Sequence, residues 1–267
     1  MGGGGRKSPG PGLASSGQAV HGASSPAAAD PATACSGGAS SIADRLSVAS
    51  PGPADLLRGV GSHRIDREAG ALVYPVYSRR SRGISLGINL FPDRKLCSFD
   101  CPYCEVFPFR TDQTFSLEVL ERGLRSYAGS RGPDDPPIRD FCISGNGEPT
   151  LSPLFPQALD LAARVRDELA PGASLVVITN GSTLLDPALF DLLRRAALGP
   201  EALDLWLKVD AGTEGWYRLM DRCGLSFGDL ADAYRRFASQ APFTVQTMLC
   251  SINGNGPDLE EEAAYNA

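Results

Sequence analysis

Histidine and long apolar runs are both scarce in this sequence. The chain of 267 residues contains two histidines, His21 and His63. The first lies in a stretch poor in large side chains and the second precedes the first predicted strand, which argues against histidine-based acid-base catalysis. No stretch reaches the apolar length of a membrane span, and no apolar run of signal-peptide length follows the few basic residues at the start. We therefore expect a cytoplasmic protein.

Large apolar side chains are almost absent from residues 1–55, which consist mainly of Gly, Ala, Ser and Pro. Such a segment buries too little surface to offset the entropy of ordering it, so we predict a disordered tail. Cys35 falls in this tail and is expected to be a solvated thiol. Residues 56–267 are long enough to form one core domain.

Acidic residues outnumber basic ones over the whole chain, but one segment has an excess of basic residues. The formal net charge is -6, which disfavours nonspecific attraction to nucleic acid over the whole surface. Residues 57–110 nevertheless carry nine Arg or Lys against five Asp or Glu. Arg79, Arg80 and Arg82 form the densest part, just before the first predicted strand. They could contact a phosphate-bearing substrate or form a solvated basic turn, and the lack of interleaved aromatics favours the turn.

Short apolar runs alternate with helical patterns from Ile84 onward, which predicts an α/β fold. Strands are expected at 84–91, at 141–149 running into a glycine loop, and at 174–181, 203–212 and 243–254. Helices are expected at 116–128, 153–170, 186–198, 213–222 and 226–239. Strands connected through helices imply parallel βα units with right-handed crossovers, here as a partial, open βα barrel.

Polar segments accompany all five predicted strands. They are the loop after residue 91, the run 144–150, the run 179–181, the run 208–212 and the run 246–248. In parallel βα folds, catalytic groups lie where the carboxyl ends of strands meet the following loops. We therefore expect these five segments to meet at one edge of the sheet.

Three cysteines dominate the first of these segments. Cys97, Cys101 and Cys104 have the spacing Cys-x3-Cys-x2-Cys, so three thiolates come from one short loop. A cubane iron-sulfur cluster held by three thiolates keeps one iron open to a ligand that is not protein. A structural zinc site would need a fourth ligand, and no second CxxC pair is present. A disulfide is disfavoured because thiols this close, without a secretory signal, more often bind metal.

Cys97, Cys101, Tyr103 and Cys104 together resemble the CxxxCxφC signature of the radical S-adenosylmethionine (SAM) superfamily, in which φ is aromatic. The resemblance implies a 4Fe-4S cluster on the three cysteines and a fold of the radical SAM type. It also implies that the open iron chelates the amino and carboxylate groups of SAM. One-electron reduction, from a donor such as flavodoxin or ferredoxin, would then cleave SAM to a 5′-deoxyadenosyl radical.

Further site residues follow from the same resemblance. The segment Gly145 to Pro149 is similar to the glycine-rich GGE-type segment that offers polar groups to the SAM amino group, with Gly145, Gly147 and Glu148 as the expected contacts and Asn146 as a departure. An ordinary turn or a phosphate loop is the alternative, although a P-loop would need the Lys and Ser or Thr that are missing. Asn180 resembles the residue that reaches the SAM ribose and carboxylate, and an Asn-Gly turn is its alternative. Tyr103 is expected to help seat the adenine.

Lys208 and Asp210 are two residues apart on a predicted strand and therefore share a face. A purely structural buried pair would cost desolvation, so a ligand-facing role is favoured. Gln246 and Met248 share a face by the same argument, with core packing as the alternative for Met248. Among the other cysteines, Cys142 and Cys250 are expected within strands as small buried residues and Cys223 in a helix connection, all outside the site.

Within the superfamily, residues 74–260 resemble the iron-sulfur oxidoreductases related to the tRNA demethylwyosine synthases. If that likeness extended to activity, the substrate would be a tRNA base. The superfamily barrel commonly has a sixth strand, whereas the stretch 253–267 begins an acidic helix and then stops. The alternatives are therefore a noncatalytic iron-sulfur protein for electron transfer or sensing and a truncated, inactive homologue.

Overall fold

The computed structural model of the chain describes residues 72–78, 82–199 and 203–266. Several predictions therefore lie outside the described residues: the tail at 1–55 with Cys35, the two histidines, and the basic residues Arg79 and Arg80. The start of the core domain at residue 56 lies outside them as well.

The described residues are built on one six-stranded sheet with the order β1-β2-β3-β4-β5-β6. Its strands are β1 (Val73–Ser78), β2 (Gly83–Asn89), β3 (Ile138–Ser144), β4 (Ser174–Thr179), β5 (Asp204–Lys208) and β6 (Thr244–Gln246). Strands β2 to β6 pair in parallel, and β1 pairs with β2 in the antiparallel sense. In the described part of the chain β6 does not pair with β1, so the predicted open α/β sheet is confirmed.

Strand β1 was not predicted from the sequence. Pro75 interrupts its run VYPVYS, and a proline in such a run argues against a central strand because it cannot donate to the ladder. An edge strand tolerates it, since only one of its sides is paired. Tyr74 fastens β1 across β2 through a hydrogen bond of 2.9 Å between its hydroxyl and that of Ser144 at the end of β3.

The predicted helices are all present. They are α1 (Leu117–Gly129), α2 (Phe155–Leu169), α3 (Pro187–Leu198), α4 (Glu214–Met220), α5 (Phe227–Ala238) and α6 (Leu259–Tyr265), with short 3-10 turns η4 (Pro149–Leu151) and η5 (Ser182–Leu185). Ser116 caps α1 and Asp186 caps α3, because their side-chain oxygens accept backbone N–H groups of the first turn. No helix in the described ranges has the length and hydrophobicity needed to cross a bilayer.

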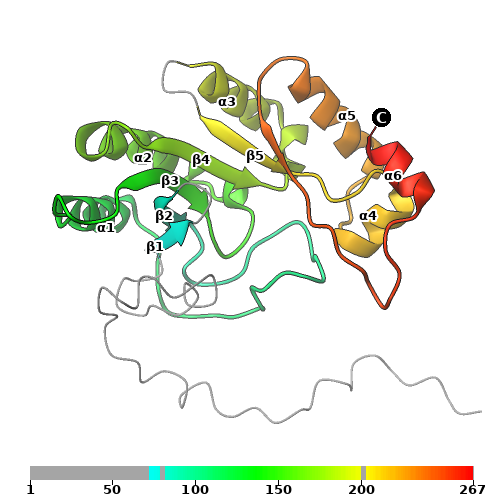
Figure 1. Ribbon diagram of the computed structural model, residues 1–267, viewed down its shortest axis with the longest axis horizontal. Helices are drawn as coiled ribbons and strands as arrows, with labels where there is room; N and C mark the ends of the chain where they lie inside the picture. Colours follow the sequence, from blue (N-terminus) through cyan, green and yellow to red (C-terminus); the bar gives the residue numbers. More distant parts are fainter. Residues whose placement is uncertain (1–71, 79–81, 200–202, 267) are drawn as a thin grey trace, which may run out of the picture. The chain divides into compact units, whose positions relative to one another are not determined.

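The core lies between the sheet and the helices α1, α2, α3 and α5, which run along one side of the sheet in Figure 1. Its fully buried members come from neighbouring strands and from the facing helices: Leu86, Ile88, Phe141, Ile143, Val177, Leu205, Leu207, Leu120, Leu124, Phe155, Leu193 and Phe237. Continuous apolar strands of this kind are typical of a parallel sheet covered by helices.

The last strand is much shorter than predicted. A strand was expected over 243–254, but β6 ends at Gln246, whose carbonyl accepts the N–H of Val209 at 3.1 Å. Beyond it, Met248 donates its N–H to a carboxylate oxygen of Asp210 at 2.8 Å and so leaves the ladder. Cys250 consequently lies outside any strand, with its sulfur 3.7 Å from that of Met220.

The packing of α5 gives a first testable prediction. Phe237 is fully buried and its ring lies 5.3 Å from that of Phe190 and 6.1 Å from that of Phe243. Phe237→Ala should lower the free energy of unfolding by about 3–5 kcal/mol, because it removes buried apolar surface and leaves a cavity. Urea denaturation followed by circular dichroism measures this. Leu198→Ala, at a side chain 55% exposed, is the control, and an equal loss in both variants would contradict the assigned core.

Candidate functional site

The polar segments after strands β2 to β6 meet at one edge of the sheet, which we call the carboxyl edge. Four contacts connect them. Leu96 pairs with Gly147 through the backbone, the Asn180 side chain donates to the Ser98 hydroxyl at 3.0 Å, Tyr103 donates to Asp210, and Asp210 accepts from Met248. The convergence expected from the strand pattern is therefore present.

The cysteine loop after β2 carries three free thiols, each half-buried. Cys104 donates its N–H to the carbonyl of Cys101 at 3.0 Å, which closes a tight turn between the two. Phe99, between the first two cysteines, is 5% exposed and packs edge-on against Tyr217 at 6.1 Å. This buried ring anchors the loop on α4.

The electrostatic surroundings of these thiols favour a positively charged occupant. Burial raises the pKa of Cys97. Burial also raises the pKa of Cys101 to about 12, and the nearby carboxylates of Asp221 and Asp210 add to that rise. Thiols in such surroundings keep their protons unless a metal displaces them. Three thiols on one loop fit the donor set of a 4Fe-4S cluster with one open iron.

The other described cysteines have different partners. Cys142 is buried in β3 with its sulfur 3.7 Å from the Ser144 hydroxyl, and the Cys223 sulfur accepts the N–H of Leu225 at 3.4 Å. None of these contacts involves the three cysteines of the loop, and the exclusion of Cys142, Cys223 and Cys250 from the site stays a prediction.

The glycine loop after β3 is held against the cysteine loop by backbone contacts. Leu96 donates its N–H to Asn146 at 3.2 Å, and its carbonyl accepts the N–H of Glu148 at 2.8 Å. Gly147 lies between these bonds with a φ of 157°, and a Cβ there would be 1.8 Å from the Leu96 carbonyl oxygen. Only glycine fits this approach. Gly145, with a φ of 121°, packs in the same way against Asn89.

Glu148 is a buried carboxylate satisfied entirely by the protein around it. Its side chain is 2% exposed and accepts hydrogen bonds from the hydroxyls of Thr150 and Thr179 at 2.5 and 2.7 Å. It also accepts the N–H of Thr150 at 3.1 Å and that of Asn180 at 2.7 Å. Burial raises the pKa of Glu148, and these hydrogen bonds oppose the rise. The carboxylate thus connects the glycine loop with β4, and its contact with a SAM amino group stays a prediction.

Asn180 lies directly against the cysteine loop. Its amide nitrogen is 3.6 Å from the Cys97 sulfur, besides its bond to Ser98, and its amide oxygen accepts the N–H of Ser182 at 3.0 Å. The Asn-Gly turn proposed as the alternative is also real, because Gly181 has a φ of 69°. The turn is what aims the amide at the cysteines.

Lys208, Asp210 and Tyr103 form one network at the end of β5. The Lys208 ammonium lies 3.4 Å from the Asp210 carboxylate and 5.0 Å from the centre of the Tyr103 ring. Asp210 is 5% exposed and receives the Tyr103 hydroxyl. The pKa of Tyr103 is raised by burial and by this contact with Asp210. The predicted shared face of Lys208 and Asp210 therefore exists, and the cysteine loop is attached to it.

Three further residues complete the comparison between the sequence predictions and the structure. Asp221, at the end of α4, lies with its carboxylate within 4.8 Å of ligand atoms of Cys101 and Asp210, yet no motif marks it. Arg82 is exposed at the amino end of β2, opposite the carboxyl edge, so the solvated turn is the better interpretation for this residue. Met248 is 38% exposed and joins the site through its backbone.

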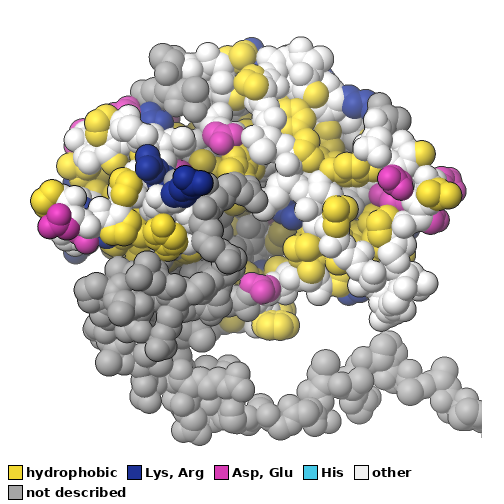
Figure 2. All heavy atoms as spheres, viewed as in Figure 1, with side chains coloured by type: hydrophobic (Ala, Val, Ile, Leu, Met, Phe, Trp, Pro, Cys, Tyr) yellow, Lys and Arg dark blue, Asp and Glu magenta, His cyan; other side chains and the backbone are white. Residues whose placement is uncertain are grey.

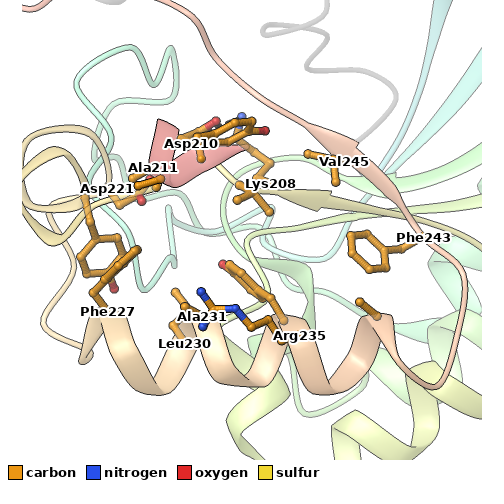
Figure 3. Close-up of a pocket in the computed structure, with 17 residues that line it drawn as sticks. Lys208, Asp210, Ala211, Asp221, Phe227, Leu230, Ala231, Arg235, Phe243 and Val245 are labelled. Atoms are coloured by element: carbon orange, nitrogen blue, oxygen red, sulfur yellow. Dashed lines mark ion pairs between the residues drawn. The ribbon is translucent and has the colours of Figure 1, made fainter. Parts of the chain in front are cut away.

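A cavity of about 230 Å³ opens beside the network, between the loop after β5, the helices α4, α5 and α6, and β6 (Figure 3). Helix α6 forms part of its wall because Glu261, 5% exposed, accepts the N–H of Thr213 at 2.8 Å and holds the helix on the loop after β5. Asp221 lies at one end of this cavity. No local motif marks this cavity, because its wall comes from five separate elements of the chain.

Comparison with known proteins gives partial matches. No protein-family model matches the chain. It is 31% identical over 134 residues to the UPF0026 proteins of two Helicobacter pylori strains, covering 49% of this chain and 41% of each relative. The chain thus spans less than half the length of these curated relatives.

Solved structures overlay on parts of the chain as well. Native anSMEcpe with bound AdoMet matches with a TM-score of 0.44 and 21% identity, over 60% of this chain and 42% of that chain. A radical SAM methyltransferase from Sphaerobacter thermophilus matches with a TM-score of 0.47 and 14% identity, over 72% of this chain and 54% of that chain.

The contact at Gly147 yields a prediction about the cysteine loop. Gly147→Ala should push Leu96 away and destabilise the protein by about 1–3 kcal/mol, and iron bound after anaerobic reconstitution should fall. Gly172→Ala is the control, because a Cβ there meets nothing within 4 Å. Iron per chain and melting temperature are measured for both. Full iron loading in Gly147→Ala would contradict the proposed dependence.

The environment of Asp221 predicts a pH dependence. Burial and the nearby charge of Asp210 raise the pKa of Asp221 to about 7, so the folded protein favours the protonated acid. Stability from this group is present below the unfolded pKa of about 4 and is lost as the pH rises through about 7. Without a cluster, Asp221→Asn should therefore gain stability over the wild type as the pH rises, by about 2–4 kcal/mol near pH 8.

Urea denaturation between about pH 4 and pH 8 measures this difference. Asp229→Asn, at an exposed carboxylate in the first turn of α5, should show no comparable trend. A wild type and Asp221→Asn with parallel stability curves would contradict the buried charge.

Proposed function

We propose that this protein is a radical SAM enzyme that binds a 4Fe-4S cluster through Cys97, Cys101 and Cys104. The observation that supports it most strongly is the position of these three free thiols, on one loop held at the carboxyl edge against the glycine loop, Asn180 and Asp210. A cluster with only three protein ligands keeps an iron for an exogenous ligand. When bound, the cluster and SAM supply a one-electron reductive cleavage that generates a 5′-deoxyadenosyl radical.

The protein contributes position and shielding from water. Two groups lie beside the cysteines: the Asn180 amide, next to the Cys97 sulfur, and the backbone of the glycine loop. Tyr103 is held by Asp210 and covered by the Lys208 ammonium, so its ring is fixed next to Cys104. These polar groups are where the ends of SAM would bind, with the Tyr103 ring near its adenine.

The reaction class, partners and substrate belong to the same proposal. An oxidoreductase or lyase-type reaction would need a one-electron donor such as flavodoxin or ferredoxin. The branch related to the tRNA demethylwyosine synthases suggests a tRNA base as substrate, supported by the motif pattern in residues 74–260. RNA copurifying with the protein would support this substrate, and its absence would count against it.

The assay is formation of 5′-deoxyadenosine by anaerobically reconstituted protein given SAM and dithionite. The wild type should form it, and Cys101→Ala should reduce the product to background because the cluster loses a ligand. Cys250→Ala, at a thiol that contacts Met220, should retain the activity. A reconstituted cluster without SAM cleavage would contradict the enzyme and favour a noncatalytic iron-sulfur protein or an inactive homologue.

A further inference from the structure

Figure 3 shows a polar end and an apolar end in the cavity beside the cysteine loop. Asp210 and Asp221 lie at one end, Phe243 and Val245 at the other, and α5 lines the length between them with Leu230, Ala231 and Arg235. The polar end adjoins Cys101, since the ligand atoms of Cys101, Asp210 and Asp221 all lie within 4.8 Å of one another. A molecule in this cavity would therefore reach the cysteine loop.

Among the described residues at this end, Asp221 is the carboxylate with an oxygen that lacks a hydrogen-bond partner. The residue is 3% exposed, and its Oδ1 has no hydrogen-bond partner among the described residues. The neighbouring buried acids are different: Asp210 receives Tyr103 and Met248, and Glu261 receives Gly212 and Thr213. Buried polar atoms are normally partnered, so a bare carboxylate oxygen at the end of a cavity indicates a place for a donor.

The charges around Asp221 indicate which donor it is. The Lys208 ammonium forms an ion pair with the Asp210 carboxylate at 3.4 Å. The Arg235 guanidinium forms one with the Asp232 carboxylate at 3.1 Å, on the solvent side of α5. No ion pair to Asp221 exists within the described ranges. The ionised form of a buried carboxylate that no cation contacts is costly, and a positively charged ligand would stabilise that form.

We propose that Asp221 binds the ammonium group of a small organic substrate whose apolar body extends along α5 toward Phe243. A metal ion shared by Cys101, Asp210 and Asp221 is disfavoured, because Lys208 already neutralises Asp210. Cys101 is assigned to the iron-sulfur cluster, and in this respect the proposal rests on the proposed function. One remaining carboxylate holds a metal ion poorly, whereas it suffices for a hydrogen-bonded ammonium. The substrate class that this cavity favours is thus a primary amine with an apolar or aromatic body, as an alternative to the tRNA base named under the proposed function.

The test uses phenethylamine as probe and the uncharged 2-phenylethanol as its isostere, titrated calorimetrically into reconstituted protein. The wild type should bind the amine at least about tenfold more tightly than the alcohol, the difference that a charge-assisted hydrogen bond supplies. Asp221→Asn should lose this preference, and Asp229→Asn should keep it. Ala231→Phe, which fills the cavity and leaves Asp221 in place, should abolish binding of both probes.

Three outcomes would overturn the proposal: no preference for the amine in the wild type, the same preference in Asp221→Asn, or Asp221-dependent binding of Mn²⁺ that excludes the amine. Iron content and absorbance of the cluster are recorded for every sample. A protein that binds the amine through Asp221 but never assembles a cluster would refute the proposed radical chemistry and leave the amine site standing. A loaded cluster without amine preference would refute only the amine site.

Discussion

The backbone pairing of Leu96 with Gly147 is the contact on which the rest of the site depends. It joins the loop that carries the cysteines to the loop after β3. Leu96 makes both hydrogen bonds, donating to the carbonyl of Asn146 and accepting from the N–H of Glu148. The approach is so close that no side chain fits at position 147. Because β3 is a central strand, the cysteine loop is attached to the interior of the sheet, even though it has no regular structure of its own.

Two buried carboxylates extend this attachment to the following strands. Glu148 connects to Thr179 at the end of β4 and to Asn180 just after it, and Asp210 connects Tyr103 to the chain beyond β6. Both are satisfied by donors on at least two separate segments, which offsets the cost of burying them. Asp221 differs from both, because one of its carboxylate oxygens has no donor among the described residues. This difference is the reason to expect a ligand there.

Local patterns were sufficient for most of the fold and for the residues that share a motif. These features depend on neighbours only a few residues away, so the sequence is enough to predict them: the caps Ser116 and Asp186, the helical spacing and the apolar strands. Strand β1 was missed because its proline is tolerated only at an edge, and β6 was overextended because a side chain, Asp210, replaces its ladder partner. Asp221 and the cavity depend on contacts between distant elements, which no local pattern records.

The bond between Tyr103 and Asp210 spans 107 positions of the chain. Contacts of such large sequence separation form slowly compared with a hairpin or a helix, so we expect this contact to form late, once the strands between the two residues have assembled. Until then the three thiols would be on an unconstrained segment, open to oxidation. If the chain holds the cluster proposed above, iron delivery is accordingly expected to succeed on the completed sheet and to fail on a nascent or partly unfolded chain.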